Sequence, residues 1–194
     1  IAEITKGANK VNKVSIVPRG LAALGYTLNT PEENKYLTQK HELIAEVDVL
    51  LGGRAAEEVF IGEISTGAGN DLERATGIIK SMATVYGMSD IAGLMVLEKR
   101  SNQFLGGQTQ KDFSDAMAKD LDDHTKKLLN ERYEIVLQEL RDNSASIEQM
   151  TAELLDIEVI SGERVREIIK ENGGTVFEDG DLHTDAIVSD DKVK

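Results

Sequence analysis

The stretch S-D-A-M-A-K-D-L-D-D-H-T-K-K-L-L-N-E-R-Y-E-I-V-L-Q-E-L at residues 114–140 decides the fold class of this chain. Its apolar side chains recur at helical spacing, so they line one face of a helix. They are Met117, Leu121, Leu128, Val136 and Leu140. The pattern predicts one long helix that buries an aliphatic stripe.

Other segments with this periodicity predict further helices, so we expect a mainly α fold. The expected ranges are 38–59 with Thr38 as N-cap, 72–86 ended by Gly87, 147–157, and a last helix through Ile169 with Ser161 as cap. Gly52 and Gly53 interrupt the first of these at a cost of about 1 kcal/mol each relative to alanine. Either something packs closely at this pair, or the helix breaks there.

Two short segments with alternating apolar and polar residues predict a small antiparallel β element. Residues 11–17 place Val14 and Ile16 on one face, and residues 24–28 alternate in the same way. A turn at Pro18 would join them. Two strands alone are only marginally stable, so we expect them to pack on helices.

The composition limits the core and the partners. Of the 194 residues, 40% are hydrophobic but only 4% aromatic, which favours one domain with an aliphatic core. The formal net charge of -13 repels phosphate backbones, so nucleic acid is not expected as a partner. There is no cysteine, so a metal would have to bind His, Asp or Glu. An acidic stretch without periodicity at residues 174–194 predicts a disordered tail after a domain at residues 1–173.

Few side chains could carry chemistry. Gly20 and Gly25 have the spacing of a phosphate-binding loop, but Tyr26 follows where Lys and then Ser or Thr are needed. We therefore do not expect this chain to bind ATP through such a loop. His41, His124 and His183 have polar neighbours or lie in the tail, and we interpret them as solvated.

Asp71 remains, at the end of S-T-G-A-G-N-D (65–71) and in the first turn of a predicted helix. One interpretation is purely structural, because an acid there interacts favourably with the helix dipole by roughly 0.3–1 kcal/mol. The other is that the small residues before Asp71 leave its carboxylate open to a cation. One carboxylate does not make a zinc site, since catalytic zinc takes three protein ligands and a water.

Five motifs in this order carry a resemblance to a known family. They are V-S-I-V-P-R-G (14–20), L-G-Y-T (24–27), L-G-G-R-A-A-E-E (51–58), S-T-G-A-G-N-D (65–71) and Y-G-M-S (86–89). Together they resemble the peptidase domain of FtsH, the membrane-anchored AAA+ ATP-dependent zinc metalloprotease, over residues 1–173. The resemblance implies a mainly α peptidase domain with a small antiparallel β element.

The resemblance also implies a zinc site. In the family, two histidines of an H-E-x-x-H helix and an aspartate on a later helix hold the zinc, and Asp71 matches that aspartate. The intervening Glu of the motif is the general base. This sequence contains no H-E-x-x-H, and Ile1, Ala2 and Ile4 look like the last turn of a helix that Gly7 ends. We expect a truncated piece with the motif upstream, and therefore no proteolysis by residues 1–194 alone.

Secondary sites have two interpretations each. By resemblance, Glu57 is a partner of a zinc-binding histidine, whereas its local sequence equally allows a solvated pair with Arg54. The strand around Gly25, Tyr26 and Thr27 either offers an open edge to an extended substrate or is a structural hairpin only.

For the parent protein, the resemblance implies one zinc per subunit and a separate ATPase module that binds ATP. It implies hexameric homo-oligomers in the bacterial inner membrane, with this domain on the cytoplasmic side. The substrates would be unfolded or membrane proteins. The alternative is a non-catalytic helical oligomerisation module.

Overall fold

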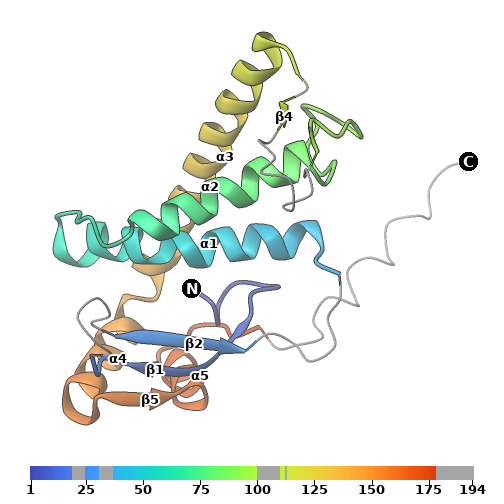
Figure 1. The fold of residues 1–194 in the computed structure, drawn as a ribbon. Helices are drawn as coiled ribbons and strands as arrows, with labels where there is room; N and C mark the ends of the chain where they lie inside the picture. Colours follow the sequence, from blue (N-terminus) through green and yellow to red (C-terminus); the bar gives the residue numbers. More distant parts are fainter. Residues whose placement is uncertain (19–24, 31–36, 100–109, 112, 178–194) are drawn as a thin grey trace, which may run out of the picture. The chain divides into compact units, whose positions relative to one another are not determined.

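The computed structural model describes residues 1–18, 25–30, 37–99, 110–111 and 113–177 (Figure 1). The chain forms two compact units: one from Ile1–Val49 with Gln138–Lys194, the other from Leu50–Leu137. Two helices contribute residues to both: α1 (Lys40–Ala56) and α3 (Asp115–Asp142). The predicted acidic tail lies beyond residue 177 for the most part and so outside the described residues.

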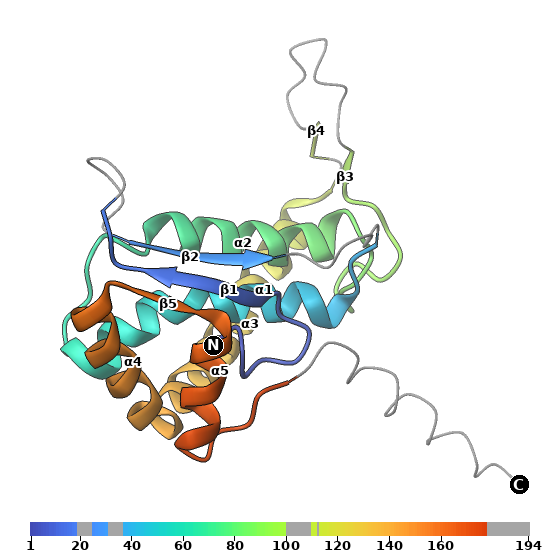
Figure 2. The ribbon, with the colours of Figure 1, turned by 90° about the horizontal axis from the view of Figure 1, so that it is seen from below.

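A three-stranded antiparallel sheet is the centre of the first unit (Figure 2). Its order is β2 (Tyr26–Thr30), β1 (Lys10–Ser15), β5 (Val159–Ser161), with β1 in the middle. The predicted antiparallel pair is thus confirmed, with Val14 opposite Thr27. β5 was not predicted, because three residues are too few to display an alternating pattern. The turn predicted at Pro18 runs into residues 19–24, outside the described residues.

Two helices pack with this sheet, α4 (Ser144–Ile157) and α5 (Gly162–Glu171). Both helices were predicted, although α4 begins at Ser144 and not at Ile147, and α5 continues past Ile169 to Glu171. Ser161 caps α5 as expected, its Oγ accepting a hydrogen bond of 3.2 Å from Arg164 N. The buried centre of this core consists of Ile160, Val165 and Ile169. The core is aliphatic, as the composition predicts.

The first helix, α1, begins at Lys40, so the cap is Gln39 and the prediction of Thr38 was wrong. The reason is that the Glu42 carboxylate accepts a hydrogen bond of 2.7 Å from Gln39 N, which is half of a capping box. The helix runs through Gly52 and Gly53, so the alternative of a helix break at this pair was wrong. A Cβ atom at Gly53 would meet nothing within 4 Å, so close packing does not explain this glycine.

The second unit is mostly helical. α1 passes into a π-helical turn, η1 (Glu57–Ile61), and α2 (Gly69–Thr84) follows. Ala75, Ile79 and Met82 of α2 are buried as predicted, whereas Tyr86 lies beyond the helix end and is exposed. A two-stranded ladder of β3 (Glu98–Lys99) and β4 (Gln110–Lys111) precedes α3.

The predicted fold class, mainly α with a small antiparallel β element, is confirmed. α3 covers the predicted range 114–140 almost residue for residue. The segment predicted as the last turn of a helix, Ile1 to Gly7, forms turns that end at Gly7 with φ +86°. In the described part of the chain, no helix has both the length and the apolar character to cross a membrane.

Candidate metal site

Asp71 lies in the first turn of α2, where the sequence predicted it. Ala68 occupies the N-cap position and has no side chain that could bond the helix start. The Asp71 side chain is 43% exposed, and its Oδ1 lies 3.9 Å from Arg74 Nη1 one turn later. An ion pair at this distance and exposure is weak. The carboxylate therefore remains accessible to a cation.

The loop before Asp71 is held by Glu57. The Glu57 carboxylate accepts hydrogen bonds from both the Oγ and the backbone N of Ser65, the latter at 3.1 Å. Ser65 Oγ in turn accepts a bond of 3.1 Å from Gly67 N. The bonds from Ser65, and secondarily Arg54 at 4.0 Å, hold the pKa of the Glu57 carboxyl below its usual range.

Glu57 thus has the Arg54 neighbour that its local sequence predicted, and also a partner that the sequence analysis missed. The S-x-G pattern at Ser65 signals only the bond from Gly67 N, because serine hydroxyls often accept from the amide two residues on. No local pattern signals the bonds from Ser65 to Glu57, which lies eight residues away. The expected contact of Glu57 with a zinc-binding histidine stays a prediction.

Glu58, the next residue, is held by α3. The Tyr133 hydroxyl donates a hydrogen bond of 2.7 Å to Glu58 Oε2 and lies 3.5 Å from the carbonyl oxygen of Arg54. Burial, reinforced by the bond to Glu58, raises the pKa of Tyr133 to about 12. The end of α1 and the start of η1 are therefore fastened to α3.

The interpretation of the histidines as solvated was wrong for two of them. His41 is half-buried beside Gly7, and its Nε2 atom is buried without a hydrogen-bond partner among the described residues. His124 is half-buried, with Nε2 3.3 Å from Ser89 Oγ. In both cases another segment packs on the imidazole, which polar sequence neighbours do not indicate. His183 lies outside the described residues.

The predicted substrate edge lies on β2. This strand pairs only with β1 in the described sheet, so its other edge carries no strand there. Thr27 is exposed, and the Tyr26 ring has Lys13 Nζ 5.5 Å from its centroid. Gly25 has a structural reason to be glycine, because a Cβ atom would lie 2.7 Å from Ser15 O. Whether substrate binds here stays a prediction.

The side chains of the described residues do not by themselves make a complete zinc site. Within the described residues, no three His, Asp or Glu side chains come together as a metal site. Asp71 fits as one oxygen ligand, since it is exposed on a fixed helix end. Zinc would require further ligands from outside this set.

The sequence matches the model of Peptidase family M41 over residues 1–168. The chain belongs to this family. Among curated relatives of this M41 chain, the ATP-dependent zinc metalloprotease FtsH of Helicobacter felis is 67% identical over 173 residues, which cover 88% of this chain and 27% of the relative. FtsH of Sulfurovum sp. is 60% identical over 88% of this chain and 26% of its own length. FtsH of Clostridium perfringens is 41% identical over 87% and 24%. The M41 chain thus spans about a quarter of the length of the relatives it matches.

Proposed function

We propose that this M41 chain is the peptidase region of an ATP-dependent zinc metalloprotease, in which Asp71 is a zinc ligand. The observation that carries the proposal is the exposed Asp71 carboxylate at the start of α2, inside the region that the family match covers. The matched relatives are themselves described as ATP-dependent zinc metalloproteases.

Bound zinc would supply a water of lowered pKa as the nucleophile for peptide hydrolysis. The contribution of this chain is to present one carboxylate oxygen from a rigid helix end. The loop of small residues at 65–70 keeps the approach to that oxygen open. The remaining ligands and the general base would come from an H-E-x-x-H segment outside residues 1–194, so these residues alone would be inactive.

The decisive experiment uses the full-length protein and the variant Asp71→Ala. We expect zinc, measured by mass spectrometry of the metal, to fall from about one ion per chain towards zero, and casein hydrolysis to be lost. Glu73→Ala is the matched control, because it removes an exposed acid from the same turn of α2. Casein hydrolysis or zinc content that survives Asp71→Ala would leave the alternative, a non-catalytic oligomerisation module.

We also propose that the open edge of β2 binds an extended substrate by strand addition. Main-chain hydrogen bonds tolerate many sequences, which suits a protease for unfolded or membrane proteins. Tyr26 and Thr27 lie in the regular part of the β1–β2 ladder, one opposite Ser15 and the other opposite Val14. Consecutive residues of an antiparallel strand direct their N–H groups to opposite sides.

This alternation gives a test of the edge. Proline has no N–H group, so Tyr26→Pro and Thr27→Pro should differ in effect. One variant removes a backbone hydrogen bond to β1 and lowers the melting temperature. The other removes only an N–H group that is directed away from β1. We expect the variant of near-normal stability to show a several-fold higher KM for a peptide substrate at unchanged zinc content. An unchanged KM in that variant would show that substrate does not bind at the open edge of β2.

The rest of the proposal concerns the whole protein. Resemblance to FtsH supports a separate ATPase module, a hexameric ring and anchoring in the bacterial inner membrane with this region on the cytoplasmic side. It also supports a domain at residues 1–173. The acidic composition of residues 174–194 separately predicts a disordered tail.

A further inference from the structure

We propose that Glu57 and Ser65 are positioning residues that fix the loop carrying Asp71, so that its carboxylate is placed before the metal binds. This inference rests on the proposed function, because it assigns Asp71 to zinc. It differs from the expected role of Glu57 beside a zinc-binding histidine, since the partner here is the loop itself.

The π-helical turn places Glu57 for this role. Gly62 N bonds to Glu57 O at 3.0 Å, a five-residue step that closes the wide turn, and Gly62 then has φ +80°. Such turns are frequent at functional sites. Here the turn ends α1 with Glu57 able to reach Ser65, eight residues along the chain.

From Glu57, hydrogen bonds continue without a gap to α2. Ser65 donates twice to Glu57 and accepts from Gly67 N, and Gly69 N bonds to Thr66 O at 3.1 Å. The first turn of α2 begins at this point, and Asp71 is two residues further on. The loop is therefore tied at its entry, within itself, and at its junction with the helix.

The loop position 67 has a second reason to be occupied by glycine. A Cβ atom on Gly67 would lie 3.2 Å from Ser65 Oγ and 3.8 Å from Glu57 Oε1. It would crowd the Ser65 hydroxyl, whereas its distance to Glu57 is an ordinary van der Waals contact. Glycine at position 67 therefore leaves room for the Ser65 hydroxyl that bonds to Glu57.

The other end of the tether is also fixed. Glu57 has only 20% of its side chain exposed, and its neighbour Glu58 is bonded to Tyr133 of α3. Two adjacent carboxylates therefore face different elements, one the loop and one a long helix. Any displacement of the loop has to break hydrogen bonds to an element that is itself held.

The test compares Ser65→Ala with wild type in the full-length protein, first without metal. We expect the Ser65 and Gly67 amides to exchange hydrogen about 10-fold faster. The Gly67 amide loses its acceptor, Ser65 Oγ, and the Ser65 amide loses the hydroxyl bond that helps to hold it against Glu57. Zinc affinity, measured by competition with a chromophoric chelator, should then be about 10-fold lower, as for residues that orient metal ligands. The melting temperature should stay near that of wild type.

Two further variants make the result specific. Ser65→Thr keeps the hydroxyl and should restore both exchange rate and zinc affinity. Thr151→Ala removes an exposed hydroxyl of α4 that also makes one hydrogen bond, and should change neither. If Ser65→Ala shows the hydrogen exchange and zinc affinity of wild type, the positioning role is overturned. The proposed function would still stand in that case, provided that Asp71→Ala loses zinc. Retained zinc in Asp71→Ala would overturn that function instead, whatever the exchange rates.

Discussion

At Gly162, a single added atom would meet the backbone of another element. This glycine is the first residue of α5, and a Cβ atom there would lie 1.7 Å from the carbonyl oxygen of Val11 in β1. No rotamer change can relieve a contact between two backbones. The helix start and the central strand would have to move apart.

We therefore expect Gly162→Ala to lower the free energy of unfolding by about 3 kcal/mol or more. The measurement is urea unfolding followed by circular dichroism. Gly53→Ala is the matched control, since its Cβ meets open space in a helix, and it should be neutral or stabilising by up to about 1 kcal/mol. Equal effects of the two changes would contradict the role assigned to the Val11 contact.

At this scale the sequence is informative where a residue's role follows from its neighbours in the chain. Asp71 in a first helical turn and Ser161 as a cap could be placed from a few adjacent residues. The bonds of Ser65 to Glu57 and of Tyr133 to Glu58 could not, because they join residues 8 and 75 positions apart. The zinc assignment of Asp71 depended on the ordered family motifs, since local physics also allows an ordinary helix-start acid.

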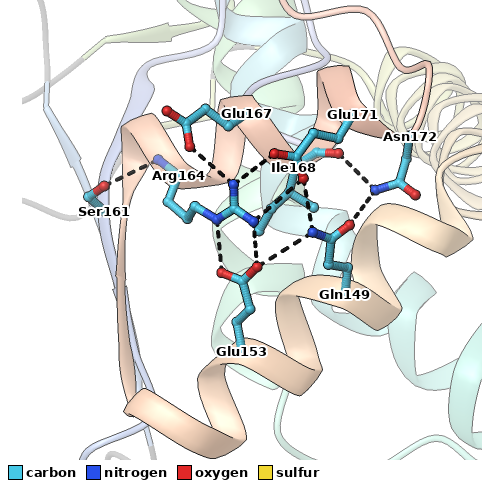
Figure 3. A network of polar contacts seen from close by, with 8 residues as sticks. All are labelled: Gln149, Glu153, Ser161, Arg164, Glu167, Ile168, Glu171 and Asn172. Atoms are coloured by element: carbon cyan, nitrogen blue, oxygen red, sulfur yellow. Dashed lines mark hydrogen bonds and ion pairs between the residues drawn. The ribbon is translucent and has the colours of Figure 1, made fainter.

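Among the elements, α4 and α5 are joined by a polar network around Arg164 (Figure 3). The guanidinium bonds to Glu153 at 2.6 and 3.0 Å, and to Glu167 and Glu171 at 3.1 and 2.9 Å. Gln149 extends the network to Glu171 at 3.0 Å. These bonds from Arg164 lower the pKa of the Glu153 and Glu171 carboxyls.

The network predicts that the difference in stability between wild type and an Arg164 variant depends on pH. Because both pKa values are lowered from 4.5 in the folded state, the stabilisation is complete above pH 4.5 and is lost as pH falls through the lowered values. Arg164→Gln should lower the melting temperature by a few degrees at pH 7, and the difference from wild type should shrink in strong acid.

The control for this pair of melting curves is Arg141→Gln, which removes an exposed arginine near the end of α3. It should change the melting temperature little at either pH. If Arg164→Gln lowers the melting temperature equally at pH 7 and in acid, packing of the Arg164 side chain, and not its carboxylate partners, stabilises the α4–α5 pair.

The elements themselves were predictable in proportion to their length. A helix such as α3 displays several turns of periodicity, so its range followed from the sequence. β5 and η1 are too short for any period, and Thr38 was chosen as a cap although the Glu42 carboxylate selects Gln39. Tyr86 continues the helical spacing of apolar residues in the sequence, but α2 ends at Thr84.

For the whole molecule, the division into units was not apparent from composition. The first unit takes its residues from both ends of the chain, and the second takes a continuous middle segment. Sequence patterns describe neighbours along the chain, so they cannot reveal that the start and the end of the chain fold together. The pairing of β1 with β5 is the clearest instance, with Lys13 opposite Ser161.

That pairing has a consequence for synthesis on the ribosome. Within residues 1–194, β1 and β2 are made before α1 to α4, and β5, which covers the other edge of β1, is made only after them. Until then the edge of β1 that β5 will cover has no partner strand, and unpaired strand edges promote aggregation. We therefore expect nascent chains that stop before Val159 to depend on chaperones far more than chains that include β5.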